Sequence, residues 1–415
     1  MGTLRSGGMT ASEERRASWD ELFFDLVAVA GVAALAHILI GELSWTSLGL
    51  YALLFLAFWQ TWTAFMLFGN IGGESVRLGQ LLVGMFGIGV MSAAIPGVAH
   101  EVLARQVDER STHAAHVFAL AYFLTRIAAS RAIGRKLVID FPIVQQTFGT
   151  LPWLGSVFVN QLGVVIMLWC IGIAIDLFGI IAISGQDVER EQERRYQKAA
   201  RRTEKSPLPD SRRAQARLEL FRRSTVSVSA DHLAERLGLF VIIVLGEGVV
   251  QVVTAASGAA LRRGTALAGL LAFALLAAIF TLSVRSGYAG VPHLRPDDLP
   301  VRFALGLHAV TSATIAALAV GLASVIAIRG QAPPDDVRWL LCGAVATYLT
   351  VGLAATTAAR STTLYRAVPW LAAGLITPAV IALTGPRLAA NGIVALLLGS
   401  VVMTLALSRE RSRSS

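Results

Sequence analysis

Long stretches without a formal charge restrict the fold of this chain more than any other feature. Four of them are at least 21 residues long: Leu48–Gly69, Leu78–Ala99, Gly264–Val284 and Phe303–Ile328. A run of about 18 or more such residues predicts a helix that spans a membrane. Only 15% of the 415 residues are charged, whereas a soluble domain has about 25%. The sequence therefore predicts a polytopic membrane protein and excludes an ordinary soluble one.

The apolar spans fall into two groups around a long polar segment. Those before it cover about 20–40, 46–68, 77–97, 113–132, 140–158 and 161–183. Those after it cover about 234–256, 264–285, 302–328, 338–358, 368–384 and 391–407. The fifth span is weak, so the region 139–183 could hold one long helix or two short ones. We predict an all-α bundle of about twelve transmembrane helices in two six-helix halves, 1–183 and 231–408.

The arginine distribution predicts the orientation. The segment 184–230 holds twelve basic and seven acidic residues, and both the N-terminal segment and the tail 409–415 carry three arginines each. Basic residues favour the cytoplasmic side, so we expect a multi-pass protein of the cell membrane with both termini and the linker 184–230 in the cytoplasm. The linker, helical up to Arg202, is expected to touch anionic lipid headgroups, with docking of a cytosolic partner as the alternative. It lacks the features of a nucleic-acid-binding module.

Acidic residues interrupt two apolar helices, one at the start of each half. The first segment runs Glu21-Leu22-Phe23-Phe24-Asp25, and the second extends from Glu235 to Glu247. A charge near the centre of a membrane helix costs roughly 3 kcal/mol on insertion scales. Such residues therefore need a partner or a function.

At these segments the chain resembles the bacterial low temperature requirement A family. The resemblance rests on Glu21–Val27 and His232–Glu247, with weaker echoes at single positions: Trp59, Trp62, Arg126, Trp169, Asp176 and His308. It implies an integral membrane protein whose family name refers to growth in the cold, and it implies no substrate. The Phe-Phe-Asp entry and the six-plus-six plan are more loosely similar to the two-repeat endosomal potassium and proton channels. The shared acidic opening of both halves predicts an internal repeat of parallel topology, related by an axis along the membrane normal.

In the first helix, Glu21 and Asp25 are four residues apart and share one face. Two carboxylates there repel each other unless a cation lies between them or one is protonated. Ser18–Glu21 also has the pattern of a capping box, which alone could explain Glu21. The alternative for Asp25 is a structural ion pair with an arginine of another span.

In the helix that opens the second half, His232, Glu235 and Arg236 fall on one turn, where Glu235 could satisfy Arg236 or another arginine. Glu247 and Gln251 continue the Arg236 face, because eleven residues make about three turns. The alternative for Glu247 is a neutral acid that only packs between helices. We treat Glu21, Asp25, Glu235 and Glu247 as candidates to handle an ion or proton.

Further polar residues inside spans are Arg126, Asp176 and His308. Arg126 and Asp176 are natural partners for Asp25 and for each other, whereas His308 is either a satisfied structural histidine or a titrating one. No cofactor or metal site is expected, since the zinc, phosphate-loop and nucleophile motifs of soluble enzymes are absent.

These residues predict a transporter or channel for a small ion or solute, with protons as the coupling ion. Asp25 and Glu247 would handle it, and Arg236 and Arg126 would set their protonation. The rivals are a non-transporting assembly or sensory protein, and an intramembrane enzyme acting on a lipid-like substrate. Besides the lipid bilayer and the solute, a homo-oligomer is left open.

Overall fold

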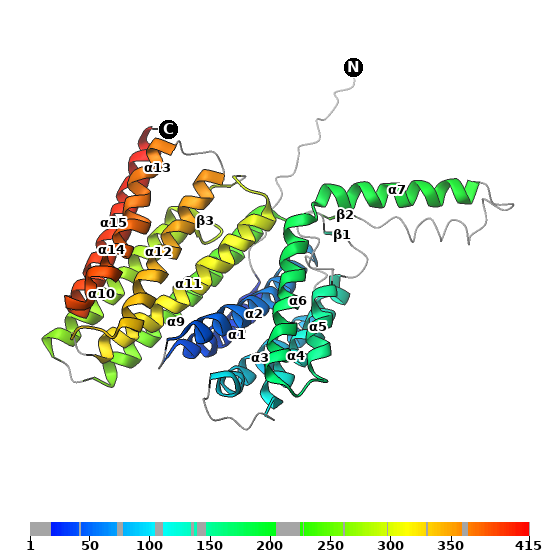
Figure 1. Ribbon diagram of the computed structural model, residues 1–415. Coiled ribbons are helices and arrows are strands. Elements are labelled where there is room, and N and C mark those ends of the chain that lie inside the picture. The colour runs from blue at the N-terminus through cyan, green and yellow to red at the C-terminus, as the bar shows by residue number, and fades with distance from the viewer. Residues whose placement is uncertain are drawn as a thin grey trace, which may run out of the picture.

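The computed structural model describes residues 18–40, 43–72, 78–103, 111–133, 137–138, 147–204, 225–226, 228–259, 262–296, 298–328, 331–358 and 364–414. Helices dominate this part of the chain, which confirms the predicted all-α membrane bundle (Figure 1). Within it, ten helices are long and apolar enough to cross a membrane. We call the described residues up to 183 the first half and those from 228 onward the second half.

The first half contains six α-helices and short additional elements. Their bounds are α1 Trp19–Ala36, η1 His37–Leu39, α2 Trp45–Gly72, α3 Leu78–Leu103, α4 His113–Ile133, β1 Leu137–Val138, η4 Phe148–Thr150, α5 Leu151–Ser156 and α6 Leu162–Ala182. Helix α7, Gly185–Glu204, follows at the start of the predicted linker and projects away from the bundle. It confirms the helical reading of this segment, and the rest of the linker up to residue 224 lies outside the described residues.

The second half is preceded by β2, Thr225–Val226. Its elements are α9 Ala230–Ser257, α10 Arg263–Phe280, η5 Thr281–Arg285, β3 Gly287–Tyr288, β4 Val291–Pro292, α11 Val301–Ala327, α12 Asp335–Ala358, α13 Leu364–Leu371, η6 Ala372–Ile376, α14 Thr377–Thr384, η7 Gly385–Arg387 and α15 Ala390–Ser414. The strands form only two short pairs, parallel β1–β2 and antiparallel β3–β4.

The fourth and fifth predicted spans differ from the other ten. Helix α4 has 21 residues but is less apolar, because it contains Arg126 and Arg131. Of the fifth span, the described part forms only η4 and α5, nine helical residues or about 13 Å, against roughly 30 Å of bilayer hydrocarbon. The count of twelve spans therefore stays a prediction.

Hydrogen bonds between element ends show that both halves start and finish at one end of the bundle. Asn70 at the end of α2 exchanges two hydrogen bonds, of 3.1 and 2.9 Å, with the backbone of Ser229, just before α9. Arg302 at the start of α11 donates to the Ile183 carbonyl behind α6 at 3.0 Å. Figure 1 places α7 and the end of α15 at this same end, which we call the α7 end.

The opposite end is defined in the same way. His116 at the start of α4 bonds the Val159 carbonyl at 2.9 Å, and Asn391 at the start of α15 donates to Gly264 at the start of α10 at 3.1 Å. Because β1 pairs with β2 beside the start of α9, Val138 lies at the α7 end, whereas Val159 lies at the opposite end. Each half thus changes ends an even number of times.

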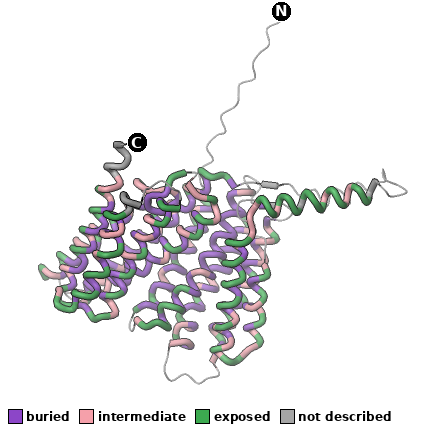
Figure 2. Tube along the Cα trace, turned by 45° about the horizontal axis from the view of Figure 1, so that its top comes forward, coloured by how far each residue is buried: buried purple, intermediate pink, exposed green. Residues whose placement is uncertain are grey.

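The two halves meet through α1 and α2 on one side and α9 and α11 on the other. Figure 2 shows buried residues between the helices and exposed residues on the outward faces and along α7. Helices α2 and α11 are the most enclosed of the ten membrane helices, since 89% and 78% of the residues in an apolar 18-residue segment of each are buried. The polar residues that these central helices enclose are therefore removed from both water and lipid.

Candidate functional site: a buried charge cluster between the halves

The first turn of α1 forms the predicted capping box. The Glu21 N–H donates to Ser18 Oγ at 3.3 Å, and the Ser18 N–H donates to Glu21 Oε2 at 2.9 Å. The box satisfies two of the backbone donors that a helix start leaves unpaired. It uses only one oxygen of the Glu21 carboxylate, and the other faces α9.

Arg236 of α9 lies between the two carboxylates of α1. Its Nε and Nη2 donate to Asp25 Oδ2 and Oδ1 at 2.9 and 2.7 Å, and its Nη1 is 3.2 Å from Glu21 Oε1. All three residues are at most 2% exposed. The guanidinium is thus the cation that the spacing of Glu21 and Asp25 required, and bidentate pairing is the strong geometry for such a contact.

Arg236 rather than Arg126 is the partner of Asp25. Both arginines were candidates from the sequence. Helices α1 and α9 lie against each other, whereas Arg126 pairs with Asp176. Arg236 also donates to the Glu21 carbonyl at 3.4 Å, which further ties it to the first turn of α1.

Aromatic residues complete the surroundings of Asp25. The Trp62 indole of α2 donates to Asp25 Oδ1 at 2.8 Å and stacks on the His308 ring of α11, with centroids 5.8 Å apart. Trp59, one turn earlier, donates to His308 Nδ1 at 3.2 Å. The weak family echoes at Trp59, Trp62 and His308 therefore belong to one site.

The hydrogen bonds of His308 specify a neutral ring. The Trp59 indole can only donate, so His308 Nδ1 must accept and carries no proton. His308 Nε2 faces the Leu237 carbonyl at 3.1 Å, which accepts its proton. His308 is fully buried, and this arrangement favours the structural alternative over the titrating one.

His232 and Glu235 extend the cluster toward the α7 end. His232 Nε2 is 3.4 Å from Glu21 Oε1, and its Nδ1 is 3.9 Å from Glu235 Oε2. The Glu235 side chain is 39% exposed. Glu235 therefore lies beside His232 at the margin of the cluster, and of the two arginine partners considered for it, Arg236 pairs instead with Glu21 and Asp25.

Three charged groups of the described residues meet in the buried core of the cluster. The carboxylates of Glu21 and Asp25 flank the Arg236 guanidinium, and the His232 ring lies beside Glu21. A proton gained by either carboxylate would change the charges that hold α1 against α9.

A second polar cluster lies within the first half. Arg126 Nη2 of α4 is 3.7 Å from Asp176 Oδ2 of α6, and the Tyr122 hydroxyl lies 3.3 Å from the same oxygen and 3.2 Å from Gln60 Oε1 of α2. Trp153 of α5 packs on Tyr122 with centroids 4.5 Å apart. The predicted pair Arg126–Asp176 thus forms, but more loosely than Asp25–Arg236.

Several buried atoms of this second cluster lack hydrogen bonds within the described part of the chain. They are Gln60 Nε2, Arg126 Nε, Trp153 Nε1 and Asp176 Oδ1. Buried polar groups are normally satisfied by protein or ordered water. Gln60, Tyr122 and Trp153 were not singled out from the sequence, where a glutamine or tyrosine in an apolar span is a weak signal.

Glu247 lies away from both clusters. It is half-buried, and its hydrogen bond within the described residues is with Gln251 of its own helix, at 3.3 Å. A hydrogen-bonding partner of Glu247 from another helix is not found among the described residues. A Cβ at Gly248 would contact Ala319 and Leu276, whereas one at Gly246 would meet open space. Glu247 thus stands at the edge of the contact of α9 with α10 and α11.

Residues suited to a metal ion are not gathered in the described part of the chain. Groups of three or more His, Cys, Asp or Glu with a metal-binding arrangement do not occur there. Cys170 and Cys342 are free thiols, the first exposed and the second buried.

The fold and the buried charges define a polytopic integral membrane protein with an ionic contact between its halves. The chain belongs to the bacterial low temperature requirement A (LtrA) family, whose family model matches residues 16–405. No curated protein and no solved structure matches the chain.

Proposed function

We propose that the protein transports a small ion or solute across the cell membrane, coupled to protons, and that the cluster of Glu21, Asp25, His232 and Arg236 is the coupling element. The observation that carries the proposal is the position of Arg236 between two carboxylates of the other half. This contact joins the two halves through charges that a proton can change.

The cost of the cluster supports a role beyond packing. Removing ions from water costs several kcal/mol each, and well-packed apolar residues of similar size often give equal or greater stability. Apolar residues of the same two helices, Phe24, Ala28, Leu237 and Phe240, are buried as well. An ion pair at this place is therefore better explained by a contact that must also open.

Protonation would act directly on this contact. A proton on Asp25 or Glu21 removes one negative charge and weakens the attraction that holds Arg236 against α1. A proton on His232 has the opposite effect, because it adds a positive charge beside Glu21. The distribution of one proton between these groups would thus favour either a closed or an open arrangement of the halves, as alternating access requires.

The same proposal covers orientation. We place the α7 end in the cytoplasm, because the linker and both terminal segments are rich in arginine. The even number of end changes in each half supports parallel halves, and hence the internal repeat. Glu247, half-buried on α9, remains a second candidate to handle an ion or proton.

The rival function is a permanent lock in an assembly or sensory protein. It is favoured by the complete pairing of Asp25, which accepts from Arg236 and Trp62 on both oxygens. A lock and a coupling element differ in the effect expected when the charges of Asp25 and Arg236 are exchanged. A lock needs opposite charges on α1 and α9 in either order, whereas coupling needs a titratable acid on the α1 side near His232.

The test measures flux by purified protein in liposomes, across a panel of ions with and without a pH gradient. The wild type and the exchange variant Asp25→Arg/Arg236→Asp are compared, with thermal stability as a control for folding. We expect wild-type flux that depends on the pH gradient, and an exchange variant that folds but loses this dependence. Absence of such flux in the wild type, or full flux in the exchange variant, would contradict the proposal.

A further inference from the structure

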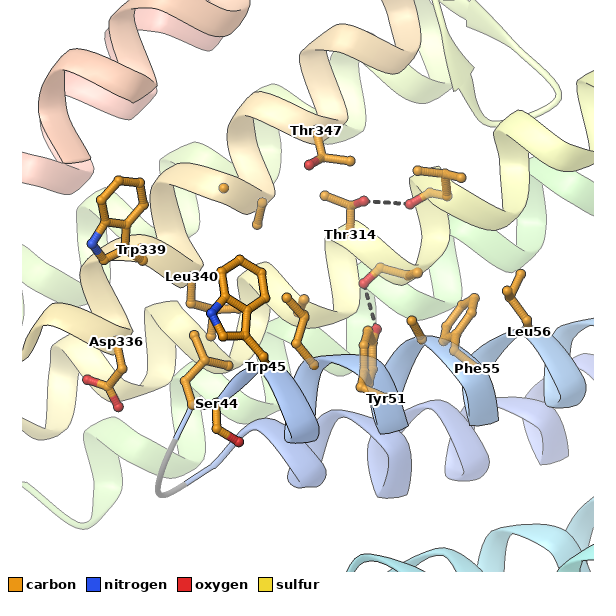
Figure 3. A pocket seen from close by; sticks show the side chains of 18 of the residues that line it. Ser44, Trp45, Tyr51, Phe55, Leu56, Thr314, Asp336, Trp339, Leu340 and Thr347 are labelled. Atoms are coloured by element: carbon orange, nitrogen blue, oxygen red, sulfur yellow. Dashed lines mark hydrogen bonds between the residues drawn. The ribbon is translucent and has the colours of Figure 1, made fainter. Parts of the chain in front are cut away.

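A large apolar groove lies between the halves, separate from both polar clusters. It has a volume of about 950 Å³ and is bounded by α2 on one side and by α11 and α12 on the other (Figure 3). It starts at Ser44 and Trp45 and extends along α2 to Phe55 and Leu56. Its inner end is thus one turn before Trp59 and the His308 site.

Two of the hydroxyl groups in the groove wall, those of Tyr51 and Thr314, are satisfied by the protein. The Tyr51 hydroxyl donates to the Ala313 carbonyl at 2.6 Å, and the Thr314 hydroxyl donates to the Val310 carbonyl at 2.6 Å. Both donors are therefore used within the wall. The wall offers an occupant mainly apolar contacts, which suits a hydrocarbon chain better than a hydrated ion.

The end of the groove opposite to the α7 end is different. Trp45 and Trp339 are 89% and 49% exposed there, and Asp336 lies near them (Figure 3). Asp335, the first residue of α12, also lines the groove. Exposed tryptophans are typical of the membrane interface. Among the described residues, the groove lining contains no basic side chain. Asp335 is paired with Arg338 at 2.8 Å, whereas the hydrogen bond of Asp336 within the described residues is from the adjacent Val337 N–H.

The length of the groove matches one lipid leaflet. From Trp45 to Leu56 the helix rises about 16 Å at 1.5 Å per residue, which is about half of the roughly 30 Å hydrocarbon core. A lipid whose headgroup lies at Trp45 and Trp339 would therefore have its chain along Tyr51 and Phe55 and its chain end near the midplane.

From this geometry we propose that the groove binds a phospholipid with an ammonium headgroup, such as phosphatidylethanolamine. Its acyl chain lies between α2 and α11, and its ammonium group lies at Asp336 and the faces of Trp45 and Trp339, which attract cations. The negative charge of Asp336 disfavours a lipid with a net negative headgroup. This site does not depend on transport, since its residues are distinct from the charge cluster.

The lipid would also connect the two halves toward the end opposite to the α7 end, where the charge cluster does not join them. The cluster joins α1 to α9 near the α7 end, and the groove separates α2 from α11 and α12 toward the opposite end. An acyl chain there fills the space that would otherwise be open to the leaflet. In the orientation proposed above, this is the outer leaflet.

Native mass spectrometry of the full chain tests the site. The protein is equilibrated with mixed vesicles of palmitoyl-oleoyl phosphatidylethanolamine and palmitoyl-oleoyl phosphatidylglycerol, extracted in mild detergent, and the retained lipid is counted. We expect the wild type to retain the ethanolamine lipid in preference. Equal retention of the two lipids would overturn the headgroup assignment.

Two variants and a control locate the binding. Gly343 lines the groove, and a Cβ there meets open space, so Gly343→Leu should fill the groove without a clash and lower retention about tenfold. Gly399→Leu on α15 is the matched control, because a Cβ there also meets open space outside the groove. Asp336→Asn should lower the preference for ethanolamine over glycerol about threefold, as an exposed charge would.

The alternatives give distinct results. If Gly343→Leu retains as much lipid as Gly399→Leu, the groove is not the site. If Gly343→Leu instead converts a dimer to a monomer, a second copy of the chain occupies the groove and the lipid proposal is wrong. Lipid retention does not depend on the transport proposal, so loss of proton-coupled flux in the variant Asp25→Arg/Arg236→Asp should leave the retained lipid unchanged.

Discussion

The Arg236 guanidinium forms two hydrogen bonds, of 2.9 and 2.7 Å, with the Asp25 carboxylate of a helix 211 residues earlier in the chain. Neither side chain is more than 1% exposed. The pair joins the first helix of one half to the first helix of the other. It is therefore the contact through which a change in either half reaches its neighbour most directly.

Removal of one member of this pair should strongly destabilise the protein. Asp25→Leu leaves the Arg236 charge with Glu21 alone, and breaking a buried pair costs about 3–5 kcal/mol. The double variant Asp25→Leu/Arg236→Leu should be less destabilised than either single variant, because it removes both charges of the pair together. Thermal unfolding in detergent measures both effects, and additive losses would show that the pair does not act as a unit.

Glu247→Gln separates titration from packing at the second acidic position. The amide keeps a hydrogen bond with Gln251 but cannot ionise, so the variant should fold normally and lose pH-dependent flux if Glu247 handles a proton. Wild-type flux in this variant would leave Glu247 with a packing role. Glu247→Leu should also fold, since its partner in the described chain is only Gln251 of its own helix.

His308 should contribute to stability and not to pH dependence. His308→Phe removes the acceptor of Trp59 and the donor to Leu237, and each buried group left unpaired costs about 1–3 kcal/mol. His308→Gln can restore one or both bonds and should be milder. Unfolding free energies of the two variants, compared over the pH range of the flux assay, check this. A pH-dependent difference between wild type and His308→Gln would contradict the neutral ring.

Cysteine labelling from outside intact cells checks the orientation. In a background without Cys170 and Cys342, Gln331→Cys lies exposed at the end opposite to α7 and should react with an impermeant reagent. Cysteines at Ser206 and Ser415, both outside the described residues, should not react, because the arginine-rich segments are expected in the cytoplasm. Ready labelling at either of those two positions would refute the proposed orientation.

The sequence predicted the apolar spans well because length and lack of charge suffice for that purpose. Ten of twelve spans correspond to long apolar helices. The two exceptions, α4 with its arginines and the short α5, are the spans whose composition differs least from that of the polar segments between spans. The capping box at Ser18 was equally predictable, since it depends on residues three apart.

The pairing of the buried charges was not predictable. Arg126 and Arg236 were equivalent as partners of Asp25 in one sequence, and only the packing of α9 on α1 distinguishes them. The Trp59–His308 bond joins residues 249 apart, and the groove depends on the relative position of α2, α11 and α12. Such contacts follow from tertiary packing rather than from any local pattern.

The sequence separation of Asp25 and Arg236 has a consequence for biogenesis. At a synthesis rate of about 5–20 residues per second, the 211 residues between them take roughly 10 to 40 s to make. During that interval α1 is complete and Asp25 has no counter-charge from α9, so its carboxyl group remains hydrated, protonated or held by another factor. The first half is therefore a translation intermediate in which Asp25 lacks its Arg236 partner, and this contact forms only when the ribosome has delivered the opening turns of the second half.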